Sequence, residues 1–236
     1  ISKNSRINLS NRIEQQEIQY DDTNGFNSHK SNTPFAFNLL YSHTKGSNTY
    51  QAVVSRGFKG AGFNPEINLT PAQQQYDPEF VMNYEVAWNY QGKEFKSNLG
   101  LFYLDRRDHQ ITTSSQDDPM DPSKFTLFVD NAARSHHYGL EWQGIWSPTS
   151  SLSFQTSLGL LRAEFVSYQL HNQSYDGREL AHSPTYTFSV GSTIRLTSSL
   201  QWNLNITGRD QFYYSNSNDQ QSKPFEIFNS SIHWQA

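Results

Sequence analysis

The stretch from Tyr76 to Tyr90 alternates between apolar and polar residues with a period of two. Successive side chains of a β-strand point to opposite faces, so this pattern predicts a strand with one apolar and one polar face. A soluble antiparallel sheet alternates in this way over a core, and a membrane barrel does so against lipid, with aromatic residues at both interfaces. One strand leaves both folds open. The apolar positions are Phe80, Met82, Tyr84, Val86, Trp88 and Tyr90.

The same alternation recurs along the chain and predicts about ten strands, separated by connections of two lengths. Short turns are predicted at residues 45–47, 91–94, 148–150 and 197–199, and long loops at 21–33, 57–78, 107–133, 168–183 and 213–223. Because short and long connections alternate strictly, every long loop lies at one end of the strands and every short turn at the other. Outer-membrane barrels have this asymmetry, with short periplasmic turns and longer extracellular loops.

Polar residues on the second face of these strands predict a wide, hydrated interior. Large barrels enclose water or a plug, whereas small ones fill with side chains. The mean hydropathy is −0.75 but 14% of residues are aromatic, which argues against disorder. We therefore predict an all-β chain that forms a transmembrane antiparallel up-and-down β-barrel. A soluble β-sandwich or lectin-like fold would explain the alternation, but neither the two connection lengths nor strands longer than about 5–6 residues. The residues expected to line the interior are Asn83, Glu85, Asn89, Lys96, Asn98, Glu141, Gln143, Arg195, Asn203, Asn205 and Arg209.

Several function classes find no support in the sequence. The net charge of −4 gives no indication of nucleic-acid binding, and there is no cysteine for a disulfide or thiolate site. No catalytic motif of a hydrolase, zinc protease or P-loop enzyme is present, so we expect neither an enzyme nor a cofactor. His136 and His137 are adjacent on a strand and face opposite ways, and the acidic group at 117–121 is expected to be a solvated loop, so no metal site is predicted.

A series of short motifs occurs in order along residues 34–230. The motifs are Ser55–Lys59, Gly62–Asn64, Tyr76–Glu79, Asn83–Glu85, Leu101–Tyr103 followed by His109–Gln110, Asn131–Ser135, Tyr138–Glu141, and Asp176–Gly177 with Pro184. Each motif is short, but in their order and spacing the chain resembles the TonB-dependent outer-membrane receptors.

The resemblance implies a 22-stranded barrel closed by an N-terminal plug domain, in the bacterial outer membrane. Residues 1–236 would be a partial barrel domain of about ten strands, with the plug and the final strands absent from this chain. It also implies active uptake of a scarce ligand, such as a ferric siderophore, energised by the TonB complex through the missing N-terminal region. A passive porin-type channel and a soluble carbohydrate-binding β-protein are the alternatives.

The long-loop end combines cationic and aromatic residues that suit an anionic or aromatic ligand. The same residues could instead form an outer aromatic belt and contact outer-membrane lipid and the phosphates of lipopolysaccharide. The candidate ligand-binding residues are Arg56, Phe58, Lys59, Phe63, Arg106, Arg107, His109, Arg209, Tyr213 and Tyr214, with Phe212 beside the last two.

Overall fold

A computed structural model describes residues 3–21, 25, 27–66, 68–118, 120–121, 123–170 and 173–235. These residues form one large antiparallel sheet and two small two-stranded sheets. Among them, no helix is long and apolar enough to cross a membrane.

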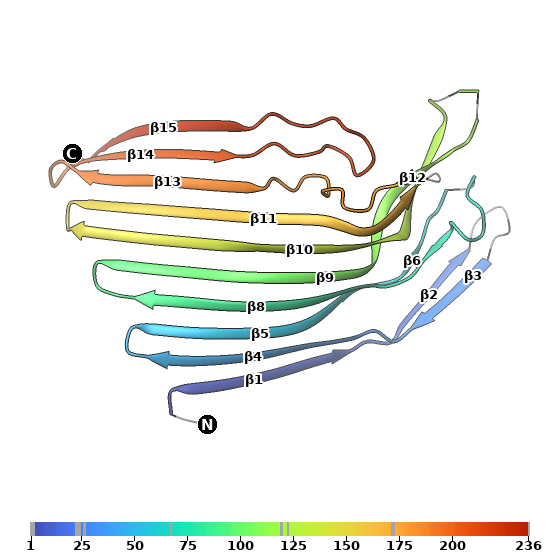
Figure 1. The fold of residues 1–236 in the computed structure, drawn as a ribbon, viewed down its shortest axis with the longest axis horizontal. Helices are drawn as coiled ribbons and strands as arrows, with labels where there is room; N and C mark the ends of the chain where they lie inside the picture. The colour runs from blue at the N-terminus through green and yellow to red at the C-terminus, as the bar shows by residue number, and fades with distance from the viewer. Residues whose placement is uncertain are drawn as a thin grey trace.

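The large sheet is built from neighbours in sequence, each antiparallel to the next (Figure 1). Its order is β1 (Ser5–Ile13), β4 (Phe35–Lys45), β5 (Asn48–Lys59), β8 (Glu79–Gln91), β9 (Phe95–Gln116), β10 (Phe125–Thr149), β11 (Leu152–Leu170), β13 (Tyr186–Arg195), β14 (Leu200–Arg209) and β15 (Phe225–Trp234). The short β12 (Gln173–Ser174) pairs with β11. The small sheets are β2 (Gln16–Asp21) with β3 (Asn27–Asn32), and β6 (Gly62–Phe63) with β7 (Gln75–Tyr76).

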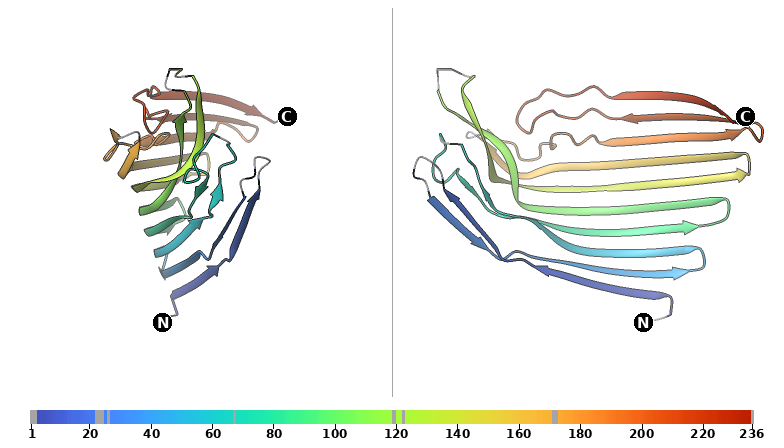
Figure 2. Two further views of the ribbon diagram at one scale, coloured as in Figure 1. Left: turned by 90° about the vertical axis from the view of Figure 1, so that its right-hand side faces the viewer. Right: turned by 180° about the vertical axis from the view of Figure 1, so that it is seen from behind.

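The connections divide between two ends, as predicted. Figure 1 shows the short turns together at one end of the strands and the long connections at the other, which we call the turn rim and the loop rim. Gly46 adopts a φ of 58° in the β4–β5 turn, a left-handed conformation that glycine enters at little cost. Seen along its edge, the sheet curves like a section of a barrel wall (Figure 2). The predicted antiparallel up-and-down sheet of about ten strands is therefore confirmed.

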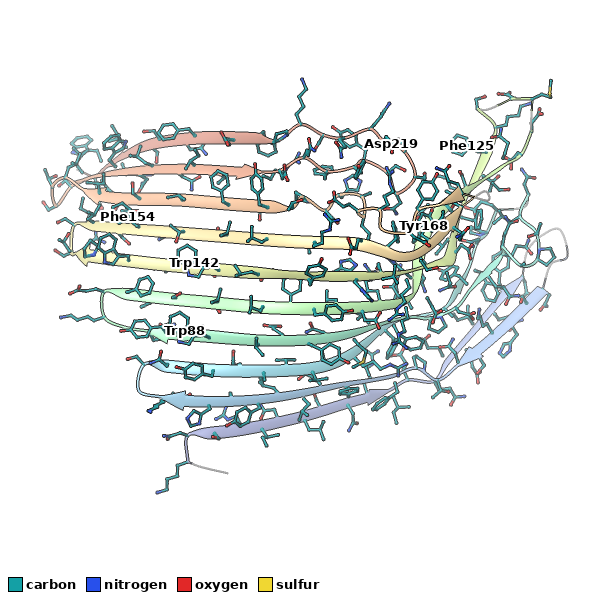
Figure 3. All side chains as sticks on the ribbon, viewed as in Figure 1. Trp88, Phe125, Trp142, Phe154, Tyr168 and Asp219 are labelled. Carbon is teal, nitrogen blue, oxygen red and sulfur yellow. The ribbon has the colours of Figure 1, made fainter. Side chains whose placement is uncertain are left out.

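The strand register places apolar and aromatic side chains in rows on the convex, outward face. Tyr84 lies opposite Tyr103, and Tyr103 lies opposite Tyr138, so three tyrosines form a row below the loop rim. The rings of Tyr84 and Tyr103 are 6.3 Å apart. Toward the turn rim lie Trp88, Trp142 and Phe154, labelled in Figure 3. These two aromatic rows are the girdles expected where a barrel crosses the two membrane interfaces.

A compact apolar cluster forms at the base of the loop rim, which we call the rim core. Phe165 and Tyr168 are 1% exposed, and their ring centroids lie 4.7 Å apart. The loop after β11 folds back over them, since Leu180 donates its N–H to the carbonyl of Ala163 over 3.0 Å. The full cluster is Ile111, Ala133, Ala163, Phe165, Tyr168 and Leu180.

The prediction of one long loop at residues 107–133 was wrong. Strands β9 and β10 continue past the tyrosine row, and their ladder runs from Asp130 opposite Ile111 to Phe125 opposite Gln116. Both segments are rich in β-branched and aromatic residues, which favour strands. Only residues 117–124 connect them, so β9 and β10 project beyond the neighbouring strands as a long hairpin (Figure 2).

The prediction of a single first strand over residues 5–20, followed by a loop at 21–33, was also wrong. The chain leaves the large sheet after Ile13, and β2 (Gln16–Asp21) pairs with β3 (Asn27–Asn32) as a separate small sheet on the loop rim. Only β2 carries apolar residues, Ile18 and Tyr20, and β3 is polar throughout, so hydrophobic alternation could not indicate their pairing.

Candidate ligand-binding rim

Three of the predicted ligand-binding residues lie on the outward face of the wall. Arg56 and Phe58 share the parity of Val54, which is paired with Tyr84 in the tyrosine row. The Arg56 guanidinium lies 4.2 Å from the centre of the Phe80 ring and donates a 2.9 Å hydrogen bond to the Phe35 carbonyl. Strand parity therefore turns these side chains toward the surrounding membrane interface rather than into the barrel.

Arg107 is the third outward residue, and it belongs to a charged network above the tyrosine row. Its Nε donates to Asp105 over 3.0 Å, and the Nε of Arg134 donates to the other oxygen of that carboxylate over 3.0 Å. Hydrogen bonding from Arg134, assisted by Arg107, lowers the pKa of the Asp105 carboxyl below its ordinary value despite partial burial. Asp105 is consequently ionised over the whole physiological pH range.

Arg106 lies on the inward face, where it is engaged by a residue that the sequence reasoning did not select. Its Nε donates to the buried carboxylate of Glu79 over 2.9 Å, and the backbone N–H of Gln110 donates to the second oxygen over 2.9 Å. The Gln110 side-chain amide in turn donates to the carbonyls of Gly60 and Asp77. This network ties β8, β9 and the loop before β8 together, so Arg106 supports the rim structurally.

His109 is buried above the tyrosine row and shares one hydroxyl with a second histidine. Ser135 Oγ lies 3.2 Å from His109 Nδ1 and 3.2 Å from His137 Nε2, and Ser135 is fully buried. Burial, followed by the nearby Arg106 guanidinium, lowers the pKa of His109 to about 4. His109 is therefore neutral near pH 7. As predicted from adjacency, His136 pairs in the outward row with Asp105, whereas His137 faces inward.

Arg209 and the following aromatic residues form the third predicted group. The Arg209 guanidinium is held between two rings, 4.3 Å from the centre of Phe212 and 4.5 Å from that of Phe225, and it donates to Ser222 Oγ over 3.1 Å. Tyr213 forms a cation–π contact with a different arginine: its ring centre lies 4.3 Å from the guanidinium of Arg178. Tyr214 is about half exposed, and its ring lies nearly perpendicular to that of Phe212, with centroids 5.7 Å apart.

The remaining two candidates are Phe63, in β6, and Lys59, at the end of β5. Phe63 stacks on Tyr20 of the β2–β3 hairpin, with ring centroids 5.7 Å apart. Lys59 ends β5, opposite Glu79, and is exposed. The ten candidates therefore do not form one site: some lie on the outward face of the wall, some on its inward face and some in the loops of the rim. The strand period of two already predicts that Arg56 and Arg107 face outward and that Arg106 faces inward, so these three residues could not have formed one site.

The inward wall carries the polar residues expected of a lumen. One hollow of about 480 Å³ is lined by amide and hydroxyl groups, including Asn89, Asn98, Gln143 and Asn205. A second, of about 400 Å³, lies nearer the loop rim and contains two carboxylates from alternate strands, Glu85 and Glu141. Among the described residues, neither of these carboxylates has an ion-pair partner within 4.0 Å; the ion pairs found involve other acidic residues.

The hairpin tip holds the acidic residues that were expected to form a solvated loop. Lys124 Nζ lies 3.3 Å from Asp118 and 3.7 Å from Asp121, and Ser123 donates to Asp121. Within the described ranges, no group of three or more histidine or acidic residues is arranged to hold a metal ion.

Comparison with known proteins agrees with this architecture. Residues 2–236 match the family model described as TonB dependent receptor-like, beta-barrel. Among solved structures, the ferric yersiniabactin uptake receptor FyuA from Yersinia pestis aligns with 98% of this chain at 17% identity and a TM-score of 0.73. The siderophore receptor PiuA from Acinetobacter baumannii aligns with 99% at 11% identity and a TM-score of 0.75, and the copper transporter OprC with 99% at 12% identity and a TM-score of 0.74.

These alignments cover only part of the solved receptors. The chain spans 35% of FyuA, 35% of PiuA and 38% of OprC. At these identities, the similarity demonstrates a shared fold of the barrel wall.

Proposed function

Because the chain belongs to the family of TonB-dependent receptor-like β-barrels, we propose that it forms part of a receptor that actively imports a scarce ligand, such as a ferric siderophore, using energy from the TonB complex. Members of this family are transport receptors of the outer membrane of Gram-negative bacteria, and the chain is accordingly an outer-membrane protein. This membership excludes the soluble carbohydrate-binding alternative. Among the similar solved structures are a ferric yersiniabactin uptake receptor, a siderophore receptor and a ferric-catecholate import receptor.

The observation that carries the proposal is the contrast between the two faces of the wall. The outward face exposes apolar residues such as Val86 of β8 and Leu101 of β9. The same two strands turn Glu85 and Asn98 inward, and the neighbouring β10 turns Glu141 inward. Carboxylates without a cation partner within the described wall suit a polar domain seated in the barrel. We infer that Glu85 and Glu141 meet basic side chains of a plug domain, which would couple the barrel to the energising complex.

The outward charges support a second contact, with lipopolysaccharide. Four arginines lie at or just above the tyrosine row on the outward face: Arg56, Arg107, Arg134 and Arg162. The side chains of the last three are at least 43% exposed. Arginine binds phosphate through two parallel hydrogen bonds. These side chains are placed to contact the phosphates at the loop-rim interface of the membrane, while the tyrosines below contact the acyl region.

The experiment that tests the transport proposal uses the full-length receptor in its source bacterium. Deleting its gene should abolish iron-limited growth on the cognate ferric siderophore, and inactivating the TonB complex should have the same effect while the receptor remains in the outer membrane. Uptake of radiolabelled iron measures both. Ligand entry that continues without the TonB complex, together with a steady conductance in planar bilayers, would instead establish a passive channel.

A further inference from the structure

The loop rim encloses a hollow whose lining includes only two of the predicted ligand-binding residues, His109 and Tyr214. It has a volume of about 530 Å³ and lies between the upper part of β9, the end of β11 and the two loops that follow β11 and β14. We call it the rim hollow. Figure 3 shows Tyr168 and Asp219 in this part of the molecule. Its polar lining includes Thr112, Thr113, Ser114, Tyr214, Ser215, Asn216 and Ser217.

The two loops that wall the hollow are fastened to each other. His182 donates its N–H to the Tyr213 carbonyl over 2.9 Å, and the Ala181 N–H donates to Asn216 Oδ1 over 2.9 Å. Arg178 stacks on Tyr213 and forms a 2.7 Å ion pair with Asp219. One side of the hollow is therefore preformed, which reduces the entropy lost when a ligand binds.

The opposite side of the hollow is part of the large sheet and rests on the rim core. Thr112 and Thr113 belong to the extended part of β9, which is paired with β10. Tyr168, at the end of β11, borders the hollow but is almost fully buried in the rim core, so it supports this side from below. A hollow between a rigid sheet and two fastened loops has the preformed, concave shape of a small-molecule site.

The described lining of the hollow contains no acidic residue, lysine or arginine. Nearby cations are engaged elsewhere: Arg178 by Asp219, Arg106 by Glu79, and Arg209 by two aromatic rings. Two histidines also line the hollow: His109, which burial keeps neutral near pH 7, and His182, whose ring centroid lies 5.2 Å from that of Phe212. An anion entering this space would lose its hydration without contacting a lysine or arginine of the described lining, which makes its binding unfavourable.

We propose that the rim hollow binds an uncharged ligand rich in hydroxyl and amide groups. Hydroxyl and amide side chains can both donate and accept hydrogen bonds to such groups, and the half-exposed Tyr214 ring provides apolar contact. Neutral ferric trihydroxamate chelates and neutral oligosaccharides both have this chemistry. The inference rests on the proposed transport function and narrows its ligand class, because it disfavours the anionic chelates that the cationic residues suggested from sequence.

Binding by the purified full-length receptor in detergent tests the proposal. Titration calorimetry would compare a neutral ferric trihydroxamate, a neutral linear glucose oligomer and a trianionic ferric tris-catecholate. We expect at least one neutral probe to bind at least tenfold more tightly than the tris-catecholate, and which of the two neutral probes binds distinguishes the sources. Tighter binding of the tris-catecholate, or no binding of either neutral probe, would overturn the proposal.

A pair of variants localises the effect to the hollow. Thr112→Arg adds a cation to its lining, whereas Thr44→Arg adds the same charge at the turn rim; both positions are exposed. We expect Thr112→Arg to weaken binding of the neutral probe at least fivefold and to strengthen that of the tris-catecholate, and Thr44→Arg to change neither. Equal effects of the two variants would contradict the assigned place. Retained heat-modifiable migration on gels verifies that both variants fold.

These outcomes separate this proposal from the transport function. A receptor that supports TonB-dependent iron uptake but binds neither neutral probe would refute the ligand class and leave the transport function intact. A receptor that binds a neutral probe at the hollow but supports no energised uptake would refute the transport function and leave the ligand class intact.

Discussion

The membrane-crossing wall and the loop rim are built from the same strands but stabilised in different ways. In the wall, the large apolar side chains are exposed: Val86 is 53% and Leu101 is 47% exposed in the isolated chain. At the rim, Phe165 and Tyr168 are almost fully buried by a loop folded back over the sheet. The wall therefore depends on the bilayer to cover its apolar face, whereas the rim has a core of its own, like that of a small soluble domain.

The largest expected effect is in the rim core. Phe165→Ala removes a buried ring and leaves a cavity, which should cost the rim about 3–5 kcal/mol. Hydrogen exchange of the full-length receptor should then become faster at residues 163–180 while the wall strands stay protected. Phe125→Ala, at an exposed position of the hairpin, is the matched control and should have little effect. Faster exchange throughout the wall would contradict the separation of the two regions.

The second prediction compares the two faces of one wall strand. Leu101→Arg places a charge against the lipid and should destabilise the folded barrel by about 2–4 kcal/mol if it lies near the bilayer midplane. Asn98→Arg places the same charge on the lumen side, so its effect should be much smaller. Urea titration of the receptor refolded into lipid vesicles measures both. Equal losses for the two variants would mean that the assignment of faces is wrong.

Acidification should loosen the rim before the wall. His109 has a folded-state pKa of about 4, below the ordinary value of 6.5, so the unfolded rim binds a proton more readily in this range. The folded rim therefore has its full stability above pH 7, where His109 is neutral in both states. This stability declines as the pH falls from 6.5 toward 4, with roughly 2 kcal/mol lost by pH 5. Hydrogen exchange at pH 7 and pH 5, corrected for intrinsic rates, measures this change.

The variant His109→Gln provides the control for the pH effect. It should reduce the pH dependence while retaining a hydrogen-bond partner for Ser135. The groups that surround His109 are Arg106, Glu79, His137 and Lys59. An unchanged pH dependence in this variant would assign the effect to one of the other titratable groups, and the inference about His109 would fail.

The smallest expected effect concerns the fastening of the two rim loops. Arg178→Ala removes the stacking on Tyr213 and should cost about 1 kcal/mol of local stability. Asp219→Asn should produce no measurable change, because the Asp219 carboxylate is 90% exposed and its ion pair is screened by solvent. Protease sensitivity of residues 175–185 and 210–224 reports both variants. A larger loss of local stability for Asp219→Asn than for Arg178→Ala would mean that the ion pair, rather than the stacking on Tyr213, holds the two loops together.

The sequence predicted most of the wall and little of the rim. Alternation located the wall strands because each side chain there faces either lipid or lumen, so local order along the chain is sufficient. It failed at residues 107–133, where extra strand pairs stand above the membrane and neither face meets lipid. Among the candidate residues, parity alone separates Arg56 and Arg107 from Arg106, but no local pattern indicates that Glu79 lies beside Arg106 or that Ser135 lies between two histidines.

The sequence alone determined the antiparallel wall, its two ends and the direction of each wall side chain, because a period of two combined with alternating connection lengths admits few arrangements. Only the tertiary structure decided the rim: the long β9–β10 hairpin, the core under the folded loop, and a hollow whose described lining contains no acidic residue, lysine or arginine although three arginines lie nearby. The physical reason is that rim contacts join residues far apart in the chain, such as Arg178 and Asp219, whose pairing depends on how the loops fold over the sheet.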